Sequence, residues 1–304
     1  MKPLSFILIT YNRPGDMLEL LQNIAGLDRA AELLEEVIIV NNCSTENYSA
    51  VKDYITGTPG LPFRYFDAPA NLGVAKGRNF ALGKGVAPLV IMLDDDAVLQ
   101  NSDCLVNLLE EFQDADTIRR KAIISFRVLY FDTLEMQKNA LPHKDYAHYH
   151  SKHNFETYYY AGGAHAIRRE VFDKVGHYPE TFFYGMEEYD LSYRILDAGY
   201  NIVYSDRITM LHKESPLGRK PKEEKYRMMW VNKSKVAYKY LPIIYFISTV
   251  LLWSIFYFRS TGFNLRGLFK GYRDVFRIPR TEKRQKISAA TINYLRRVNA
   301  RLWY

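Results

Sequence analysis

Cysteine is scarce in this chain, which has only Cys43 and Cys104 among its 304 residues. So few cysteines exclude a disulfide framework and fit a reducing compartment. We also expect no signal peptide, because the apolar start at residues 4–11 is short and is soon interrupted by Pro14. A glycine-rich phosphate loop does not follow this segment, which argues against a nucleotidyltransferase.

Apolar residues are plentiful, at 48%, and a composition with 24 tyrosines suits a globular protein that handles sugars or interfaces. Charge is distributed unevenly along the chain. Residues 1–212 carry 20 Lys and Arg against 29 Asp and Glu, whereas residues 213–304 carry 21 against 5. This acidic body and basic tail predict a tail that meets an anionic surface. A nucleic-acid binder, which the pI of about 9.1 suggests, is disfavoured by the acidic body and the apolar content of the tail.

Strand-like and helix-like segments alternate through the body. The pattern predicts strands over 4–11, 35–44, 62–69, 88–96, 122–130 and 200–205, and helices over 15–27, 73–85, 102–113, 168–176 and 184–199. Ser102 is the expected N-cap of the third helix. This order indicates a parallel-rich α/β sheet, and strands that are continuously apolar are typical of a sheet covered on both faces.

Polar residues follow three of these strands directly, at 10–12, 41–44 and 94–96. Ligands of such sheets bind beyond the carboxyl ends of the strands, so we expect these residues to line one crevice. Asp94, Asp95 and Asp96 repel one another unless a cation lies among them. A hard divalent cation, held by oxygen ligands and substrate phosphates, would remove that repulsion. An ordinary acidic turn is the structural alternative.

A second acidic cluster, Glu187, Glu188 and Asp190, opens the helix expected over 184–199. The helix dipole favours negative charge there, so a purely structural role is the alternative. Gly185 just before it, together with the first acidic cluster, favours a functional site.

Residues 143–165 lack an apolar period and mix His, Tyr and Lys, so we interpret them as a long loop or hairpin at the active-site face that binds the acceptor or acts as a lid. Aromatic faces in this loop can stack on sugar rings, and Gly162 and Gly163 permit close backbone approach. The three histidines of the loop could also bind zinc, but no set of cysteines or second carboxylates accompanies them. They are His148, His150 and His153.

Taken together, these segments resemble the family 2 glycosyltransferases, which are inverting enzymes of the GT-A (nucleotide-diphospho-sugar transferase) fold. The resemblance covers about residues 4–212 and is carried by SFILITYNR, VIIVNNCSTE, NLGVAKGRNFAL, VIMLDDDAVL, GGAHAIRREVF, MEEYDLSYRILDAGY and TMLH. It implies a Rossmann-like mixed α/β sheet flanked by helices, with a catalytic domain over 1–212 and a helical, membrane-associating tail over 213–304. Within the family the chain looks most like bacterial rhamnosyltransferase-like enzymes of surface polysaccharide synthesis.

The resemblance also implies a nucleoside diphosphate sugar as donor, with UDP- or dTDP-sugars favoured. Asn41 stands where the family usually has an Asp that contacts the base, and its amide oxygen can still accept the N3–H of uracil or thymine. The implied donor-binding residues are Thr10, Tyr11, Arg13, Asn41, Ser44, Arg78, Asn79, Asp94 and Asp95.

The reaction implied is transfer of the sugar to a hydroxyl of a lipid-linked saccharide in cell-surface polysaccharide synthesis. Mg²⁺ or Mn²⁺, held by Asp96 with Asp94 and His212, would stabilise the departing diphosphate. Glu188 matches the general base that deprotonates the acceptor, and Glu187 and Asp190 are its rivals. A catalytically inactive sugar-nucleotide-binding scaffold of a polysaccharide complex is the alternative function.

The basic tail contains an 18-residue apolar run, 241–258, which is near the lower limit for a spanning helix. Residues 262–280 then alternate bulky apolar side chains with Arg and Lys, as an in-plane amphipathic helix does. We therefore expect monotopic or re-entrant attachment at the cytoplasmic face of the cell membrane. The alternative is an ordinary C-terminal helix packed on the core.

Overall fold

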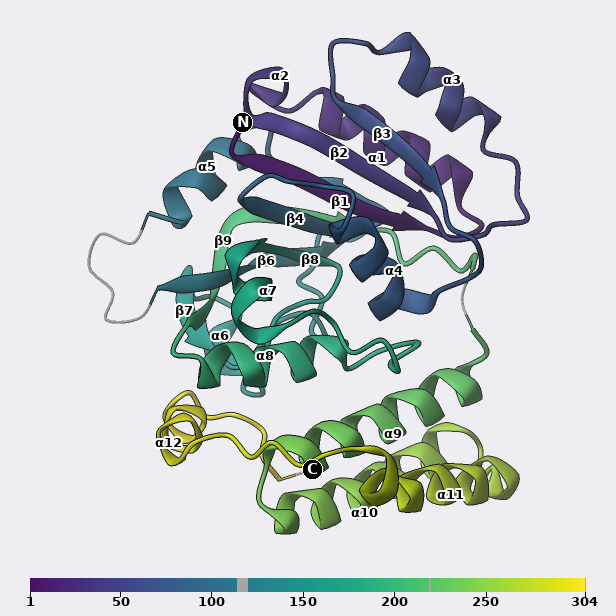
Figure 1. Cartoon of the computed structure of the whole chain (residues 1–304), viewed down its shortest axis with the longest axis vertical. Coiled ribbons are helices and arrows are strands. Elements are labelled where there is room, and N and C mark those ends of the chain that lie inside the picture. The colour runs from purple at the N-terminus through teal and green to yellow at the C-terminus, as the bar shows by residue number, and fades with distance from the viewer. Residues whose placement is uncertain (114–119, 219, 304) are drawn as a thin grey trace.

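The computed structural model describes residues 1–113, 120–218 and 220–303 (Figure 1). Its body is one mixed sheet in the order β3-β2-β1-β4-β8-β6-β9-β5, with β7 paired to β9. The strands are β1 (Leu4–Thr10), β2 (Leu34–Asn41), β3 (Phe63–Asp67), β4 (Leu89–Asp94), β5 (Ala97–Leu99), β6 (Lys121–Tyr130), β7 (Asn154–Thr157), β8 (Ala164–Arg168) and β9 (Asn201–His212). These strands confirm the α/β fold class that the alternating pattern predicts.

Four parallel strands make up one half of the sheet. β3, β2, β1 and β4 run in the same direction, with Thr10 beside Asn41 and Asn41 beside Asp67 in the register. Their carboxyl ends therefore share one edge, where Asp94 ends β4. The expectation that the polar strand ends meet at one edge is confirmed, because parallel strands in register must end together.

In the other half of the sheet, β8 runs opposite to both of its neighbours, since it is antiparallel to β4 and to β6. The reversal brings the residues that precede β8 to the carboxyl end of β4, and the amide of Asp94 donates to the carbonyl of Gly163 at 3.1 Å. β9 pairs parallel to β6, and its last residue, His212, lies beside Ala97 of β5. Two distant segments thus reach the acidic turn after β4.

Helices cover both faces of the sheet, as the continuously apolar strands predict. One face packs against α1 (Pro14–Ala25), α2 (Ala30–Leu33), α3 (Ser49–Gly57) and α5 (Cys104–Glu111). The opposite face packs against α4 (Gly73–Leu82), α7 (Glu170–Val175) and α8 (Glu187–Asp197). Side chains of a strand alternate between the two cores: Phe6 and Leu8 face the first, whereas Ile7 faces the second.

Two local expectations need correction. Ser102 does not cap a helix: α5 begins at Cys104 after Asp103, and the Ser102 hydroxyl donates to Asp28 at 2.8 Å instead. Residues 143–165 are more regular than the long loop or hairpin expected from their lack of period. They form α6 (Tyr146–Tyr149) and β7, which adds to the sheet through backbone pairing with β9.

The tail forms four helices among the described residues: α9 (Lys222–Tyr240), α10 (Ile243–Ser260), α11 (Leu265–Thr281) and α12 (Ala289–Arg297). Figure 1 shows α9, α10 and α11 side by side below the body, with α9 beneath α8. Fully buried Trp230 of α9 packs against Tyr257 of α10 and Tyr272 of α11. α9 therefore joins the body core, as the packed-helix alternative expects, whereas much of α10 remains outside it.

Gly271 sets the spacing between α11 and α9, because a Cβ there would overlap the ring of Trp230. We expect Gly271→Val to lower the free energy of unfolding by about 1–3 kcal/mol, the usual cost of overpacking. Thermal unfolding followed by circular dichroism measures the change. Lys270→Val on the exposed side of the same helix is the control, and equal melting temperatures of the two variants would contradict the packing assigned to Gly271.

Candidate active site

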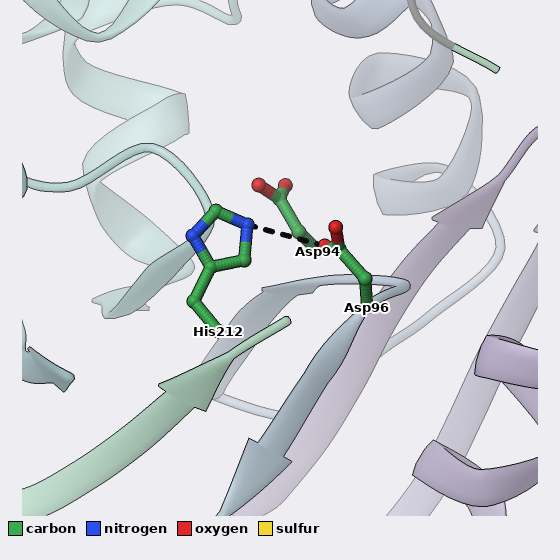
Figure 2. Close-up of side chains that lie close together, drawn as sticks. All are labelled: Asp94, Asp96 and His212. Atoms are coloured by element: carbon green, nitrogen blue, oxygen red, sulfur yellow. Dashed lines mark ion pairs between the residues drawn. The ribbon is translucent and has the colours of Figure 1, made fainter. Parts of the chain in front are cut away.

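A possible metal centre lies at the carboxyl edge of the sheet. Asp94 and Asp96 flank the turn after β4, His212 ends β9, and one ligand atom of each lies within 4.8 Å of the others. Figure 2 shows the three side chains converging, with the Nε2 atom of His212 3.3 Å from Oδ1 of Asp96. Two carboxylates and an imidazole are a donor set that suits Mn²⁺ or Mg²⁺. The residues present thus fit the divalent cation that the sequence predicts.

Neighbouring groups hold two of these ligands in place. The amide of Ser215 donates to Oδ2 of Asp96 at 2.9 Å. Burial disfavours the charge on Asp96, yet bonds from His212 and Ser215 and the charge of Arg13 keep its pKa below the usual range. On the far side of the imidazole, Nδ1 of His212 lies 2.9 Å from Oε1 of Gln137. Gln137 donates to Glu214 at 2.8 Å, which leaves its oxygen to accept the Nδ1 hydrogen and directs Nε2 into the site.

Asp95 and Arg13 form a buried ion pair beside this centre. The guanidinium donates to Asp95 at 2.7 Å and to the carbonyls of Leu217 and Ser215 at 2.7 and 3.0 Å. Burial raises the pKa of Asp95 to about 6, against the charge of Arg13. Both residues were expected to border the donor. Their contacts join the loop after β1 to the segment after β9, which carries the backbone of Ser215 to Asp96, and their contact with the donor stays a prediction.

The second acidic cluster is linked to the first by Arg78 of α4. Its guanidinium pairs with Glu187 at 2.9 Å, lies 3.8 Å from Asp94, and donates to the carbonyl of Gly162 at 2.6 Å. Arg78 is 6% exposed and Glu187 is 3% exposed. These contacts make Arg78 a strut between the two clusters, and its predicted approach to the pyrophosphate stays a prediction. Glu187 is the other member of this ion pair, and Arg78 neutralises its charge.

Glu188 and the metal ligand Asp94 both lie close to the Gly162–Gly163 turn. A Cβ at Gly162 would lie 3.9 Å from Oε2 of Glu188, and a Cβ at Gly163 would overlap the carboxylate of Asp94. The two glycines thus allow Glu188 and Asp94 to come close. Burial, followed by the charge of Glu187, raises the pKa of Glu188 well above the usual range for a glutamate. Once it has lost its proton, such a carboxylate is a stronger base than an ordinary glutamate.

Asp190 is not brought to the site, although its sequence position makes it a rival base. Its carboxylate is 1% exposed, pairs with Arg194 at 2.9 Å, and accepts from Tyr240 and Lys239 at 3.0 and 2.5 Å. The helical rotation from Glu188 to Asp190 directs Asp190 to the end of α9. It ties α8 to the tail and is unavailable to an acceptor.

Two residues predicted to bind the donor make hydrogen bonds within the fold, and their role at the donor stays a prediction. Thr10 is fully buried and shares a hydrogen bond with the hydroxyl of Tyr48 at 2.6 Å. Asn79 is bonded on both sides of its amide to the backbone of Tyr178, at 2.9 and 3.0 Å. Tyr11 and Ser44 remain partly exposed at the strand edge, where a donor can reach them.

Three contributors to the site were missed by sequence reasoning. Gln137 orients His212, Asp67 lies beside Asn41, and Lys233 of α9 lies over the ring of Tyr189, next to Glu188. Burial lowers the pKa of Lys233 to about 7, although the nearby charge of Glu188 opposes this. Of these three residues, only Asp67 had a signal in the sequence. It lies near the end of an expected strand, as the other residues of the polar sheet edge do.

Comparisons with known proteins agree with this geometry. The fold matches GT-A glycosyltransferases, among them Staphylococcus aureus TarS, with a TM-score of 0.62 at 18% identity over 91% of this chain and 49% of that one. A mannosyltransferase of Pyrobaculum calidifontis, PcManGT, solved with GDP-Man and Mn²⁺, matches with a TM-score of 0.58 at 18% identity over 100% of this chain and 81% of that one. The chain spans about half the length of TarS.

At the sequence level, an uncharacterized protein of Haemophilus influenzae is 26% identical over 58% of this chain and 92% of its own length. The family model described as glycosyl transferase family 2 matches residues 5–176. The chain belongs to glycosyl transferase family 2. This confirms the resemblance and the class of enzyme that the motifs predict, and the division of the chain at residue 212 stays a prediction.

Gly163 offers a test of the metal centre in which none of the three ligand residues is itself replaced. We expect Gly163→Ala to weaken Mn²⁺ binding at least about tenfold, because the new Cβ would displace the Asp94 carboxylate. Titration of the full chain with Mn²⁺, followed by electron paramagnetic resonance, measures the affinity. His212→Ala should give a loss of similar size.

The matched control is Gly15→Ala in α1, where no atom lies within 4 Å of an added Cβ. Its Mn²⁺ affinity should equal that of the wild type. Wild-type affinity in a folded Gly163→Ala protein would show that Asp94 is not a ligand.

Proposed function

We propose that the protein is an inverting glycosyltransferase that moves a sugar from a nucleoside diphosphate sugar to a hydroxyl of a saccharide acceptor. One observation carries the proposal: the Asp94–Asp96–His212 centre and Glu188 flank the same two-glycine turn, with Arg78 bridging their clusters. A leaving group and an acceptor can then be served from opposite sides. UDP- or dTDP-sugars are the favoured donors, with Mg²⁺ or Mn²⁺ as cofactor.

The chemistry divides between the two clusters. A cation held by Asp94, Asp96 and His212 would supply Lewis-acid stabilisation of the departing diphosphate. As the bond from the sugar C1 to the diphosphate oxygen breaks, the acceptor oxygen forms a new bond to C1 from the opposite face, which inverts the configuration. Glu188 takes the proton that the acceptor hydroxyl loses, and its raised pKa suits a general base working near neutral pH.

Replacing the general base Glu188 should abolish removal of the acceptor proton without disturbing the fold. We expect Glu188→Gln to lower kcat at least about a hundredfold while donor affinity stays near the wild-type value. In the wild type, the rate should rise with pH well beyond the usual glutamate range, since the carboxyl must lose its proton to act and burial raises its pKa. Release of the nucleoside diphosphate in reactions that contain donor and acceptor measures kcat and its dependence on pH.

Glu32→Gln, an exposed site on α2, is the control and should keep wild-type turnover and pH dependence. Retention of most activity by Glu188→Gln would overturn its assignment as base. Donor binding without turnover in the wild type, with every acceptor tested, would instead favour the inactive-scaffold alternative.

We also propose that the tail docks on the anionic cytoplasmic face of the cell membrane, where a lipid-linked saccharide of surface polysaccharide synthesis would be the acceptor. α10 is long and apolar enough to cross a membrane by length and composition, and one third of it is buried. One face of α10 exposes large apolar side chains, and α11 adds three more. They are Ile243, Ile244, Ile247, Leu251, Leu252, Ile255 and Phe256 on α10, and Leu265, Phe269 and Phe276 on α11.

Basic residues accompany this apolar surface. They are Arg259 at the end of α10 and Arg266, Lys270, Arg273, Arg277 and Arg280 on α11. Lys and Arg near anionic lipid stabilise binding by about 1 kcal/mol each. On the inner side, the amide of Asn232 in α9 donates to the carbonyls of Tyr184 and Gly185 at 3.1 and 2.9 Å. The tail thus holds the segment that begins the Glu188 helix, so a docked tail would set the site close to the lipid.

Charges placed on this face should prevent docking. We expect the triple variant Ile247→Glu, Leu251→Glu and Ile255→Glu to bind phosphatidylglycerol-containing vesicles at least about tenfold more weakly than the wild type. Vesicle co-sedimentation at physiological salt measures binding. Val86→Glu, which charges an exposed apolar site on the body, is the control and should bind normally. Equal binding by the triple variant, or preference of the wild type for duplex DNA over vesicles, would contradict the proposal.

A further inference from the structure

Asp67 occupies the donor edge of the sheet without a role in the metal centre or the strut. It is the last residue of β3 and lies beside Asn41 in the parallel register, at the edge where β1 and β4 also end. Its side chain is 59% exposed, in contrast to Asn41, which is 9% exposed. The carboxylate is therefore the accessible polar group at the end of this strand pair.

The amide of Asn41 is committed on both sides. Its nitrogen donates to Oδ1 of Asp67 at 2.9 Å, and its oxygen accepts the backbone N–H of Ser44 at 3.0 Å. A carboxylate can only accept and an N–H can only donate, so this orientation is the one that satisfies both partners. The oxygen expected to receive the N3–H of the base is thus turned toward the Ser44 loop. Reorienting it would break both bonds.

Asp67 has the opposite arrangement. Asn41 binds Oδ1 and so fixes the orientation of the carboxylate, while Oδ2 lies 3.5 Å from the ammonium of Lys52 in an exposed pair. Exposed pairs of this kind are weak and exchange readily with a ligand. An acceptor (Asp67) and a donor (Lys52) then stand side by side, which is the complement of a ring N–H next to a carbonyl.

We propose that Asp67 replaces Asn41 as the acceptor that recognises the nucleotide base, and that the base carries a ring N–H beside a carbonyl. This inference rests on the proposed function, since it concerns the donor of that reaction. Uracil, thymine and guanine have this edge. Cytosine and adenine present a bare ring nitrogen at the matching place, which would face the Asp67 carboxylate lone pair to lone pair. A hydrogen bond to the charged carboxylate is of the stronger kind.

Nucleotide preference is the first test. Calorimetry of the full chain with Mn²⁺ should rank UDP, dTDP or GDP as the tightest of five diphosphates, with CDP and ADP at least about tenfold weaker. The UDP, dTDP and GDP arms also separate a pyrimidine from a guanine donor. Tightest binding of CDP or ADP would overturn the inference.

Methylation of the ring nitrogen tests Asp67 itself. The preferred nucleotide and its N-methylated form (N3 for UDP or dTDP, N1 for GDP) are compared on wild type and Asp67→Ala. The wild type should lose at least about tenfold in affinity on methylation. Asp67→Ala should bind the unmethylated nucleotide about tenfold more weakly than the wild type and should no longer distinguish the two forms.

Asp53→Ala, which removes a neighbouring exposed carboxylate on α3, is the control and should behave like the wild type. Undiminished binding by Asp67→Ala, or discrimination against the methylated form that survives in it, would overturn the inference and leave the proposed function standing. Failure of all five diphosphates to bind with Mn²⁺ would overturn the proposed function together with the inference.

Discussion

The site depends on the ion pairs that the buried guanidinium of Arg78 makes with both acidic clusters. Two acidic clusters from distant parts of the chain meet at one sheet edge, and their repulsion would separate them without a cation between them. Arg78 lies between Asp94 and Glu187, and its remaining hydrogen bond to Gly162 fixes the turn that separates the metal centre from the base. A buried ion pair stabilises little by itself, but removal of one partner leaves an uncompensated charge. The arrangement therefore specifies a geometry more than it adds stability.

The tail belongs to this geometry as much as the sheet does. Asp190 of α8 accepts from Lys239 and Tyr240 at the end of α9, and Asn232 of α9 holds the carbonyls just before α8. The helix that carries Glu188 is thus fixed at its start and along its length by segments beyond residue 212. A membrane surface bound to α10 and α11 would consequently have a fixed position relative to the general base Glu188.

Sequence patterns were a good guide to the sheet and to the residue types at its edge. Apolar runs that end in Thr10, Asn41 and Asp94 predicted parallel strands with a common polar edge, because the strands alternate with helices along the chain and such crossovers join parallel strands. The same patterns could not separate ligands from supports. Asp94, Asp95 and Asp96 are adjacent in sequence, but only Asp94 and Asp96 turn toward His212, whereas Asp95 pairs with Arg13, which also contacts Asp96.

The order of the amino acids is enough to predict the α/β sheet, its two covered faces, the acidic clusters and the contrast between an acidic body and a basic, apolar tail. These follow from periodicity and composition, which act over a few residues. The tertiary structure alone decided that Arg78 is a strut, that Asp190 faces the tail, that Gln137 orients His212 and that Asp67 stands in front of Asn41. Each of these depends on contacts between residues at least 26 positions apart, and hydrogen-bond direction and burial at such contacts exist only once the chain has folded.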